Sequence, residues 1–216
     1  MAVLDHDEQE KVDELRAFWN TWGNRIIWAL ALVLAIVAGY YGWEFYQRRQ
    51  SEEASAVFFT LQKATADKDL GKVRQLAGEL IEHYGRTDYA VLGAFYSARA
   101  HADAKDWKSA KAVLGWAVEH ASDRGLANLA RLRLAYVLVE EGALDEALKQ
   151  LASEPEPAYA SRFLDARGDI LMMQNKPKEA RAAFEAALAK LDSQSAESAQ
   201  IREIIKFKLD SLDGAS

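Results

Sequence analysis

The fold is decided by the stretch Arg167–Ala189, which reads RGDILMMQNKPKEARAAFEAALA. Small and apolar residues recur at intervals of three and four on both sides of a central Asn-Lys-Pro, which is the pattern of two amphipathic helices joined by a tight turn. Pro177 suits the first turn of the second helix, where an N–H would have no intrahelical partner. Small residues let two helices approach, and large residues fill the space between them. These positions are held by Gly168, Leu171, Ala180, Phe184 and Ala187.

This order of small, large and aromatic positions resembles the tetratricopeptide repeat, and it recurs upstream. Residues 132–152 repeat it with a turn at Gly142, and residues 96–117 repeat it with Asp106 as the expected cap of the second helix. A more divergent unit covers residues 54–84. The matching positions are Leu134, Ala135, Leu138, Ala147 and Leu151 in the third unit, Ala98, Ala110, Leu114 and Ala117 in the second, and Phe58, Leu61, Val73, Ala77 and Leu80 in the first.

Apolar residues at helical spacing over 197–212 predict a terminal helix that covers the exposed end of the array. Pro155 and Pro157 should shorten the second helix of the third unit. Arg131 and Arg167 stand where the repeat usually has a large apolar residue, so the array should be irregular. Turn signals between the helices interrupt any long heptad register and argue against a coiled coil. The predicted fold class is all-α, with a tetratricopeptide-repeat-like α-solenoid.

The segment Ile26–Trp43, IIWALALVLAIVAGYYGW, has no charged residue. As a helix it would be roughly 27 Å long, close to the thickness of a bilayer core. Aromatic residues lie at both ends of the segment, as is typical of the interfaces between a membrane and water. We predict a single transmembrane signal-anchor helix over 26–46, an N-terminal tail over 1–25 and a repeat domain over 47–216. Two alternatives stay open: a buried helix of a soluble core, and a cleaved signal peptide, which the acidic leader disfavours.

Lys and Arg residues are balanced on the two sides of the span, so charge does not predict its orientation. The tail has an apolar face and a charged face. It would either lie along the membrane surface or extend the span as a helix, with a kink or break at Gly23-Asn24.

Small residues recur along one face of the span and would let a partner helix approach. This predicted contact face consists of Ala31, Ala35, Ala38, Gly39 and Gly42.

Composition and motifs argue against most chemistries. The sequence has no cysteine, which excludes disulfides, thiolate zinc sites and catalytic thiols. The net charge of -6 and the pI of about 5.3 argue against nucleic-acid binding. No common phosphate-binding, nucleophile or zinc-protease motif occurs, and the histidines form no ligand pair. We expect no enzymatic activity, cofactor, metal or small-molecule substrate. His101 is expected to be a core or groove residue rather than a metal ligand.

A stack of helix pairs presents a concave face built by the first helix of each unit, and such faces bind peptides or partner helices. The apolar residues of this face could alternatively pack between the repeat units. By repeat register, the predicted binding groove contains Phe95, Arg99, Leu132, Tyr136, Arg162, Asp169 and Met172.

The order of leader, span and divergent repeats resembles the YfgM family of bacterial inner-membrane proteins, which are ancillary subunits of the SecYEG translocon. The resemblance rests on the segments KVDELRAFWNTWGNR, GYYGWEFYQRRQ, SEEASAVFFTLQKA and LDARGDILMMQNKPKEARAAFEAALA, and it covers essentially the whole chain. It implies a cytoplasmic N-terminus, a periplasmic repeat domain and association with the membrane-anchored periplasmic chaperone PpiD. The hypothesis is a non-enzymatic adaptor anchored in the lipid bilayer of the inner membrane. The alternative is a membrane-anchored scaffold for another envelope or cytochrome-maturation assembly.

Overall fold

The computed structural model describes residues 6–191 and 196–213, and every regular element in these ranges is an α-helix. The chain divides into two compact units, residues 1–50 and residues 51–216. The first five residues of the predicted tail, and residues 192–195 and 214–216 of the predicted repeat domain, lie outside the described ranges. The all-α fold class predicted from the sequence is confirmed.

The first unit consists of the N-terminal part of α1 (His6–Ala66), which continues without a break through Gly23-Asn24. The ring of Trp19 lies over Gly23, where a Cβ atom would be 3.1 Å from Trp19 Cδ2. Within the described residues, α1 is the helix long and apolar enough to cross a membrane, and none of its apolar window is buried. This exposure contradicts the alternative of a buried core helix and is typical of side chains that face lipid.

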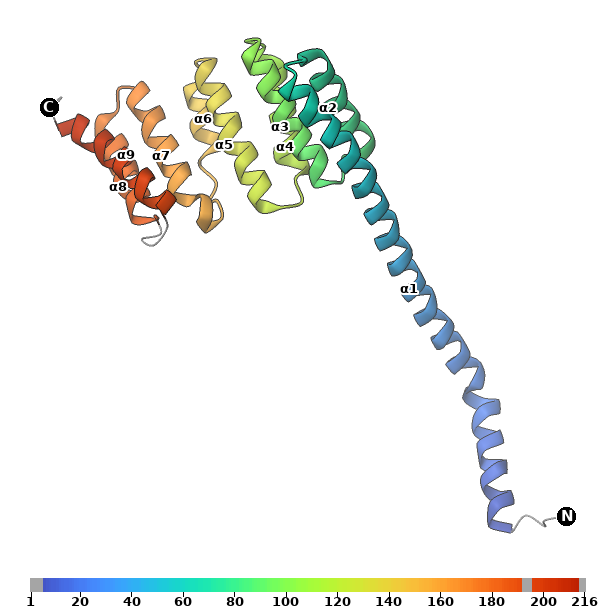
Figure 1. The fold of residues 1–216 in the computed structure, drawn as a ribbon. Coiled ribbons are helices and arrows are strands. Elements are labelled where there is room, and N and C mark those ends of the chain that lie inside the picture. The colour runs from blue at the N-terminus through green and yellow to red at the C-terminus, as the bar shows by residue number, and fades with distance from the viewer. Residues whose placement is uncertain (1–5, 192–195, 214–216) are drawn as a thin grey trace. The chain divides into compact units, whose positions relative to one another are not determined.

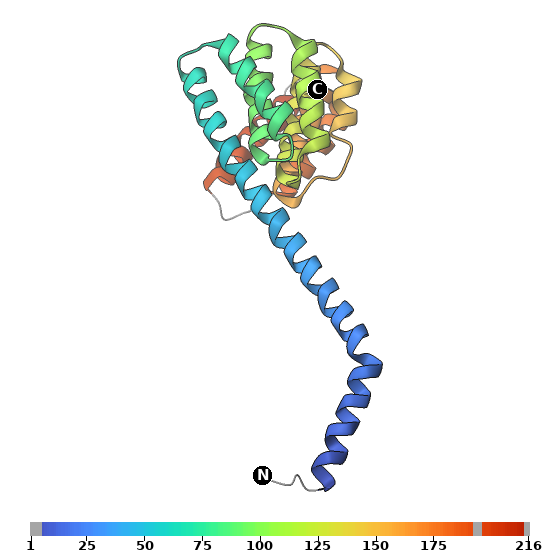
Figure 2. The ribbon, with the colours of Figure 1, turned by 90° about the vertical axis from the view of Figure 1, so that its right-hand side faces the viewer.

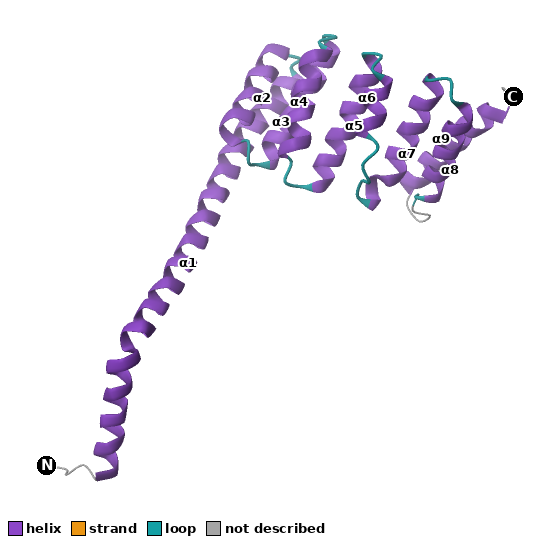
Figure 3. Ribbon diagram, turned by 180° about the vertical axis from the view of Figure 1, so that it is seen from behind, coloured by secondary structure: helices purple, strands orange, loops and turns teal. Residues whose placement is uncertain are grey.

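The second unit is an array of helix pairs that lie side by side along the chain (Figures 1 and 3). Seen along the array in Figure 2, the pairs stand one behind another. The last part of α1 packs with α2 in the core, and a terminal helix packs against α8. The remaining elements are α2 (Leu70–Tyr84), α3 (Asp88–Asp103), α4 (Trp107–His120), α5 (Arg124–Glu140), α6 (Leu144–Gln150), α7 (Pro157–Met173), α8 (Pro177–Ala189) and α9 (Ala196–Asp213).

The turn inside each helix pair has the same backbone geometry. One residue adopts a left-handed conformation, and the next residue donates its N–H to the carbonyl five residues earlier, which closes the first helix with a Schellman motif. The left-handed residues are Lys68 (φ 57°), Lys105 (φ 57°), Gly142 (φ 82°) and Asn175 (φ 59°). The closing bonds join Asp69 to Ala64, Asp106 to His101, Ala143 to Leu138 and Lys176 to Leu171. The divergent first pair is therefore a copy of the same unit as the other three.

The predicted core positions are occupied as expected. A Cβ atom on Gly168 would lie 2.6 Å from Cδ1 of Phe184, so only glycine fits between α7 and α8 there. Asp106 caps α4 through a 3.1 Å hydrogen bond from the backbone N–H of Ser109, which confirms its predicted role. The aligned small positions are buried in every unit, at Ala77, Ala98, Ala110, Ala135, Ala147 and Ala180.

The array is irregular at the third unit. Helix α6 ends at Gln150, well before Pro155, and Pro157 stands in the first turn of α7 rather than within α6. The guanidinium of Arg131 donates to Ser153 Oγ at 3.1 Å, in the loop that follows the shortened helix. A polar residue is therefore accommodated where the repeat usually has an apolar one, because the loop after the short α6 offers it a hydrogen-bond acceptor. At the C-terminal end, α9 packs through Ile205 and Leu212, whereas Ile204 is exposed.

Candidate protein-binding groove

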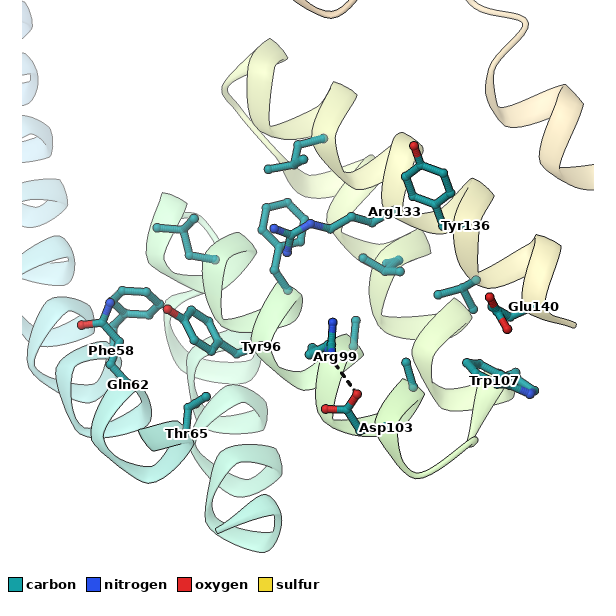
Figure 4. A pocket seen from close by; sticks show the side chains of 17 residues that line it. Phe58, Gln62, Thr65, Tyr96, Arg99, Asp103, Trp107, Arg133, Tyr136 and Glu140 are labelled. Carbon is teal, nitrogen blue, oxygen red and sulfur yellow. Dashed lines mark ion pairs between the residues drawn. The ribbon is translucent and has the colours of Figure 1, made fainter. Parts of the chain in front are cut away.

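A groove of about 900 Å³ lies within the repeat domain, along the first helices of its first three units (Figure 4). Helix α1 contributes Phe58, Gln62 and Thr65, α3 contributes the stretch from Leu92 to Asp103, and α5 contributes Leu129 to Glu140. Trp107, the first residue of α4, also lines it. Helical spacing explains the arrangement, because residues three and four apart on one helix face the same side. A hydrophobic groove along several helices is a form of surface that binds helical protein segments.

One end of the groove is aromatic. The rings of Phe58 and Tyr96 meet edge to face with centroids 5.6 Å apart, and Tyr89 lies behind Phe58 at 5.6 Å. Phe95, one residue before Tyr96, is buried and belongs to the core cluster of the second and third units. The groove is thus built on rigidly packed rings, which offer large contact area at little cost in conformational entropy.

Arg133 lies across this surface, with its guanidinium carbon 4.4 Å from the centre of the Phe95 ring. Partial burial lowers the pKa of Arg133 from its ordinary value, with Tyr96 and Tyr159 opposing that shift, and the group stays charged at neutral pH. Among the described residues, no carboxylate lies within ion-pair distance of Arg133. Within the described ranges, its charge is met by the face of the Phe95 ring.

The other charged residues of the groove are either paired or lie at its edge. Arg99 is paired with Asp103, one helical turn later on α3, with Nε 2.8 Å from Oδ1. Glu140 stands at the far end of α5 near Trp107 (Figure 4). The Arg99–Asp103 pair is exposed, so it contributes little to stability. The charge pattern of the groove therefore reduces to Arg133 in its middle and Glu140 at one edge.

Three of the residues predicted for the groove lie in it: Phe95, Arg99 and Tyr136. Leu132 is only 6% exposed and packs in the core cluster between α3 and α5, as the packing alternative expected. Arg162, Asp169 and Met172 lie on α7 and do not line this groove.

Two carboxylates of α7 are engaged by the chain itself. Lys208 of α9 donates to Asp165 Oδ1 at 2.7 Å and to Asp169 Oδ2 at 2.8 Å. Burial raises the pKa of Asp169, and the bond from Lys208 only partly offsets the effect. Burial also lowers the pKa of Lys208, but the two carboxylates outweigh it, so the net shift is upward. Asp169 therefore serves an internal ion pair.

Sequence reasoning missed Tyr96, Trp107, Arg133 and Glu140 as groove residues. Repeat register contained the signal for two of them: Tyr96 follows Phe95 and Arg133 follows Leu132, and the pairs occupy matching positions in the second and third units. Tyr96 and Arg133 both line the groove. Trp107 and Glu140 lie at helix ends, where register alone does not predict which way a side chain points.

The predicted contact face of the span is open in the structure. No heavy atom lies within 4 Å of a Cβ built on Gly39 or Gly42, and the side chains of Ala31, Ala35 and Ala38 are exposed. None of the residues that the structure describes packs on this face, and a binding role for it stays a prediction.

His101 has a structural contact. Its ring Nδ1 lies 3.0 Å from Asp106 Oδ2, in the turn between α3 and α4. Within residues 6–191 and 196–213, no group of three or more His, Asp or Glu side chains is placed to hold a metal ion. The groove is thus the feature of the repeat domain that offers a binding surface.

Residues 16–214 match the family described as tetratricopeptide repeat-like domain. The chain is 30% identical to the ancillary SecYEG translocon subunit of Neisseria gonorrhoeae, over 95% of this chain and 97% of that protein. It is 27% identical to the protein of the same name from Haemophilus influenzae, over 95% and 98%. With the protein of that name from Escherichia coli it shares 26% identity over 84% and 87%. The chain, with its apolar N-terminal helix and its four repeat-like helix pairs, belongs to the family of ancillary SecYEG translocon subunits.

Proposed function

We propose that the protein is a non-enzymatic adaptor of the SecYEG translocon, anchored in the inner membrane by α1. The observation that carries the proposal is the combination of an exposed apolar helix and an aromatic groove in one chain that matches proteins named ancillary SecYEG translocon subunits over nearly its full length. The span would hold the protein beside the translocon, and the groove would bind a protein segment. Membrane anchoring raises the effective concentration of such a segment near the groove.

In this proposal the N-terminal tail is cytoplasmic and the repeat domain is periplasmic. The span would contact a translocon helix through Ala31, Ala35, Ala38, Gly39 and Gly42, where small side chains allow close approach. The absence of cysteine makes the orientation testable with single-cysteine variants. Lys178→Cys, in the exposed first turn of α8, should react with a membrane-impermeant maleimide in intact spheroplasts. Glu14→Cys, in the tail, should react only after permeabilisation, and the inverse pattern would contradict the proposed orientation.

The partner of the groove would be a periplasmic chaperone anchored in the same membrane, similar to PpiD, or a client protein that leaves the translocon. Phe95, Arg99 and Tyr136 would contact it directly. Arg162 and Met172, which the repeat register also predicts for the concave face, would extend this surface along α7. Leu132 would support it from the core, and Asp169 would hold α9 in place through Lys208.

The test is affinity purification of the tagged full-length chain from membranes in mild detergent. Recovery of SecY together with a membrane-anchored chaperone supports the proposal. Tyr136→Ala and Tyr96→Ala, which remove groove contacts, should reduce recovery of the chaperone while leaving SecY in place. Recovery of the components of another envelope assembly without SecY would instead favour the scaffold alternative.

A further inference from the structure

We infer that the groove selects an apolar helical segment that carries an acidic side chain, and that Arg133 pairs with its carboxylate. The inference rests on the proposed function, since it specifies the chemistry of the segment that the same groove would bind. It follows from the position of the Arg133 guanidinium and from the apolar side chains that line the groove around it.

The guanidinium of Arg133 lies over Phe95, in a groove lined mainly by apolar and aromatic side chains. It makes no ion pair among the described residues, whereas the neighbouring Arg99 is paired with Asp103. An arginine offers several N–H donors in a fixed planar fork, and a carboxylate matches two of them at once. An apolar occupant without a carboxylate would cover this cation and leave it unpaired, which costs free energy. The groove therefore discriminates against wholly apolar segments.

In the last repeat unit, charged side chains on the first helix form ion pairs with a residue of the terminal helix. Asp165 and Asp169 occupy on α7 the register positions that Phe95 and Arg99 occupy on α3. Lys208, from the chain's own α9, supplies the opposite charge, with both bonds shorter than 3 Å. A helix thus brings one charged side chain to acidic positions at the end of the array. Across the second and third units the groove holds Arg133, which has no acidic partner among the described residues, and Glu140 at its far edge. The residue of a bound helix that passes over Arg133 must therefore be acidic.

The position of Arg133 indicates that the carboxylate belongs to a side chain and not to a chain terminus. In Figure 4 Phe58 and Tyr96 lie to the left of Arg133, Glu140 and Trp107 lie to its right, and Arg99 and Asp103 lie below it. A segment that covers both ends of the groove and contacts Arg133 has residues to either side of it. Its acidic residue is therefore internal, flanked by apolar residues that contact the rings.

The test uses the full-length chain in nanodiscs and two fluorescein-labelled helical peptides with blocked ends. The peptides have the same Leu- and Ala-rich sequence and differ only at one central residue, Glu in one and Gln in the other. Fluorescence anisotropy gives both affinities, and empty nanodiscs correct for peptide bound to lipid. The Glu peptide should bind about tenfold more tightly than the Gln peptide.

Two variants separate Arg133 from its surroundings. Arg133→Met keeps an apolar stem over Phe95 but removes the charge, so it should bind both peptides with the affinity of the Gln peptide. Arg131→Gln, two residues earlier on α5, removes an arginine that bonds to Ser153 and should preserve the tenfold preference. Circular dichroism checks that both variants fold.

The outcomes distinguish the inference from the function on which it rests. Equal affinity of the unchanged protein for both peptides would overturn the acidic preference and leave the groove as a binding site for protein segments. Binding of neither peptide would overturn both. A preference that survives in Arg133→Met would assign the selection to another residue and contradict the inference.

Discussion

Gly168 on α7 lies directly against the ring of Phe184 on α8, so that a Cβ atom at position 168 would be 2.6 Å from Cδ1 of the ring. Phe184 is 1% exposed and cannot move outward without opening the core between the fourth unit and α9. The close approach of the two helices therefore depends on a missing side chain, as the sequence pattern of the last repeat predicted.

Gly168→Ala should destabilise the protein by about 1–3 kcal/mol, because the added methyl group overpacks the Phe184 ring. Gly78→Ala, in the interior of α2, is the matched control, since nothing lies within 4 Å of the added atom. The control should stabilise its helix by about 0.5–1 kcal/mol. Urea unfolding followed by circular dichroism measures both effects. A similar effect of the two substitutions would contradict the proposed packing.

The left-handed turn residues give a second prediction. Lys105→Gly should stabilise the protein by up to about 1 kcal/mol, because glycine adopts a positive φ without a steric cost. Gly142→Ala, at the equivalent turn of the third unit, should destabilise it by about 1 kcal/mol. Thermal unfolding of the two variants should move the midpoint in opposite directions. Shifts of the same sign would mean that the two turns are not equivalent.

The ion pair that fixes α9 can be tested by removing its cation. Lys208→Met leaves Asp165 and Asp169 close together on α7 without a partner, which should cost about 1–3 kcal/mol. The triple variant Lys208→Met, Asp165→Asn, Asp169→Asn should recover part of that loss, since no unpaired charge remains. Chemical unfolding of the three proteins measures the coupling. A triple variant no more stable than the single one would contradict the pairing.

The Asp106 cap predicts a pH dependence. Hydrogen bonds from Ser109 hold the pKa of Asp106 below its ordinary value. A lowered pKa in the folded state means that the stabilisation is present above the ordinary carboxyl pKa and is lost as the pH falls through the folded value. Asp106→Asn keeps a capping oxygen but does not titrate. The stability difference between the unchanged protein and this variant should therefore shrink below about pH 4. A difference that does not change with pH would show that the cap is not charged.

The contact face of the span is tested by enlarging Gly39, where an added Cβ atom would contact no other part of the described chain. Gly39→Leu should leave the fold intact and reduce recovery of SecY in mild detergent, because the larger side chain holds a partner helix away. Val37→Leu, on the opposite side of the helix, serves as the control and should have no effect. Equal recovery with both variants would place the contact elsewhere on α1.

Much of the fold could be predicted from the sequence because repeats report the same packing several times. Gly168, Phe184 and the aligned alanines mark where helices touch, and Pro177 and Gly142 mark the turns. The left-handed conformations of Lys68 and Lys105 were not predictable from residue type, since lysine has no preference for that region. They follow from the Schellman motif that every pair shares.

The candidate groove was predicted only in part, for a physical reason. Register predicts Phe95, Arg99 and Tyr136 on the concave side, and all three line the groove. It also places Asp169 there, but register carries no information about α9, whose Lys208 reaches Asp169 from far along the chain. Contacts between distant segments decide which concave positions are open to a partner and which are already occupied.

The most direct test of the account is photo-crosslinking from the groove in intact cells. A benzoyl-phenylalanine replaces Tyr136, which is 47% exposed and lines the groove. A second variant carries the same group at Phe59, which is 72% exposed and does not line it. The account predicts a protein adduct from position 136, identified as a translocon-associated chaperone or a translocating client, and none from position 59. The same adducts from both positions, or none from position 136, would contradict it.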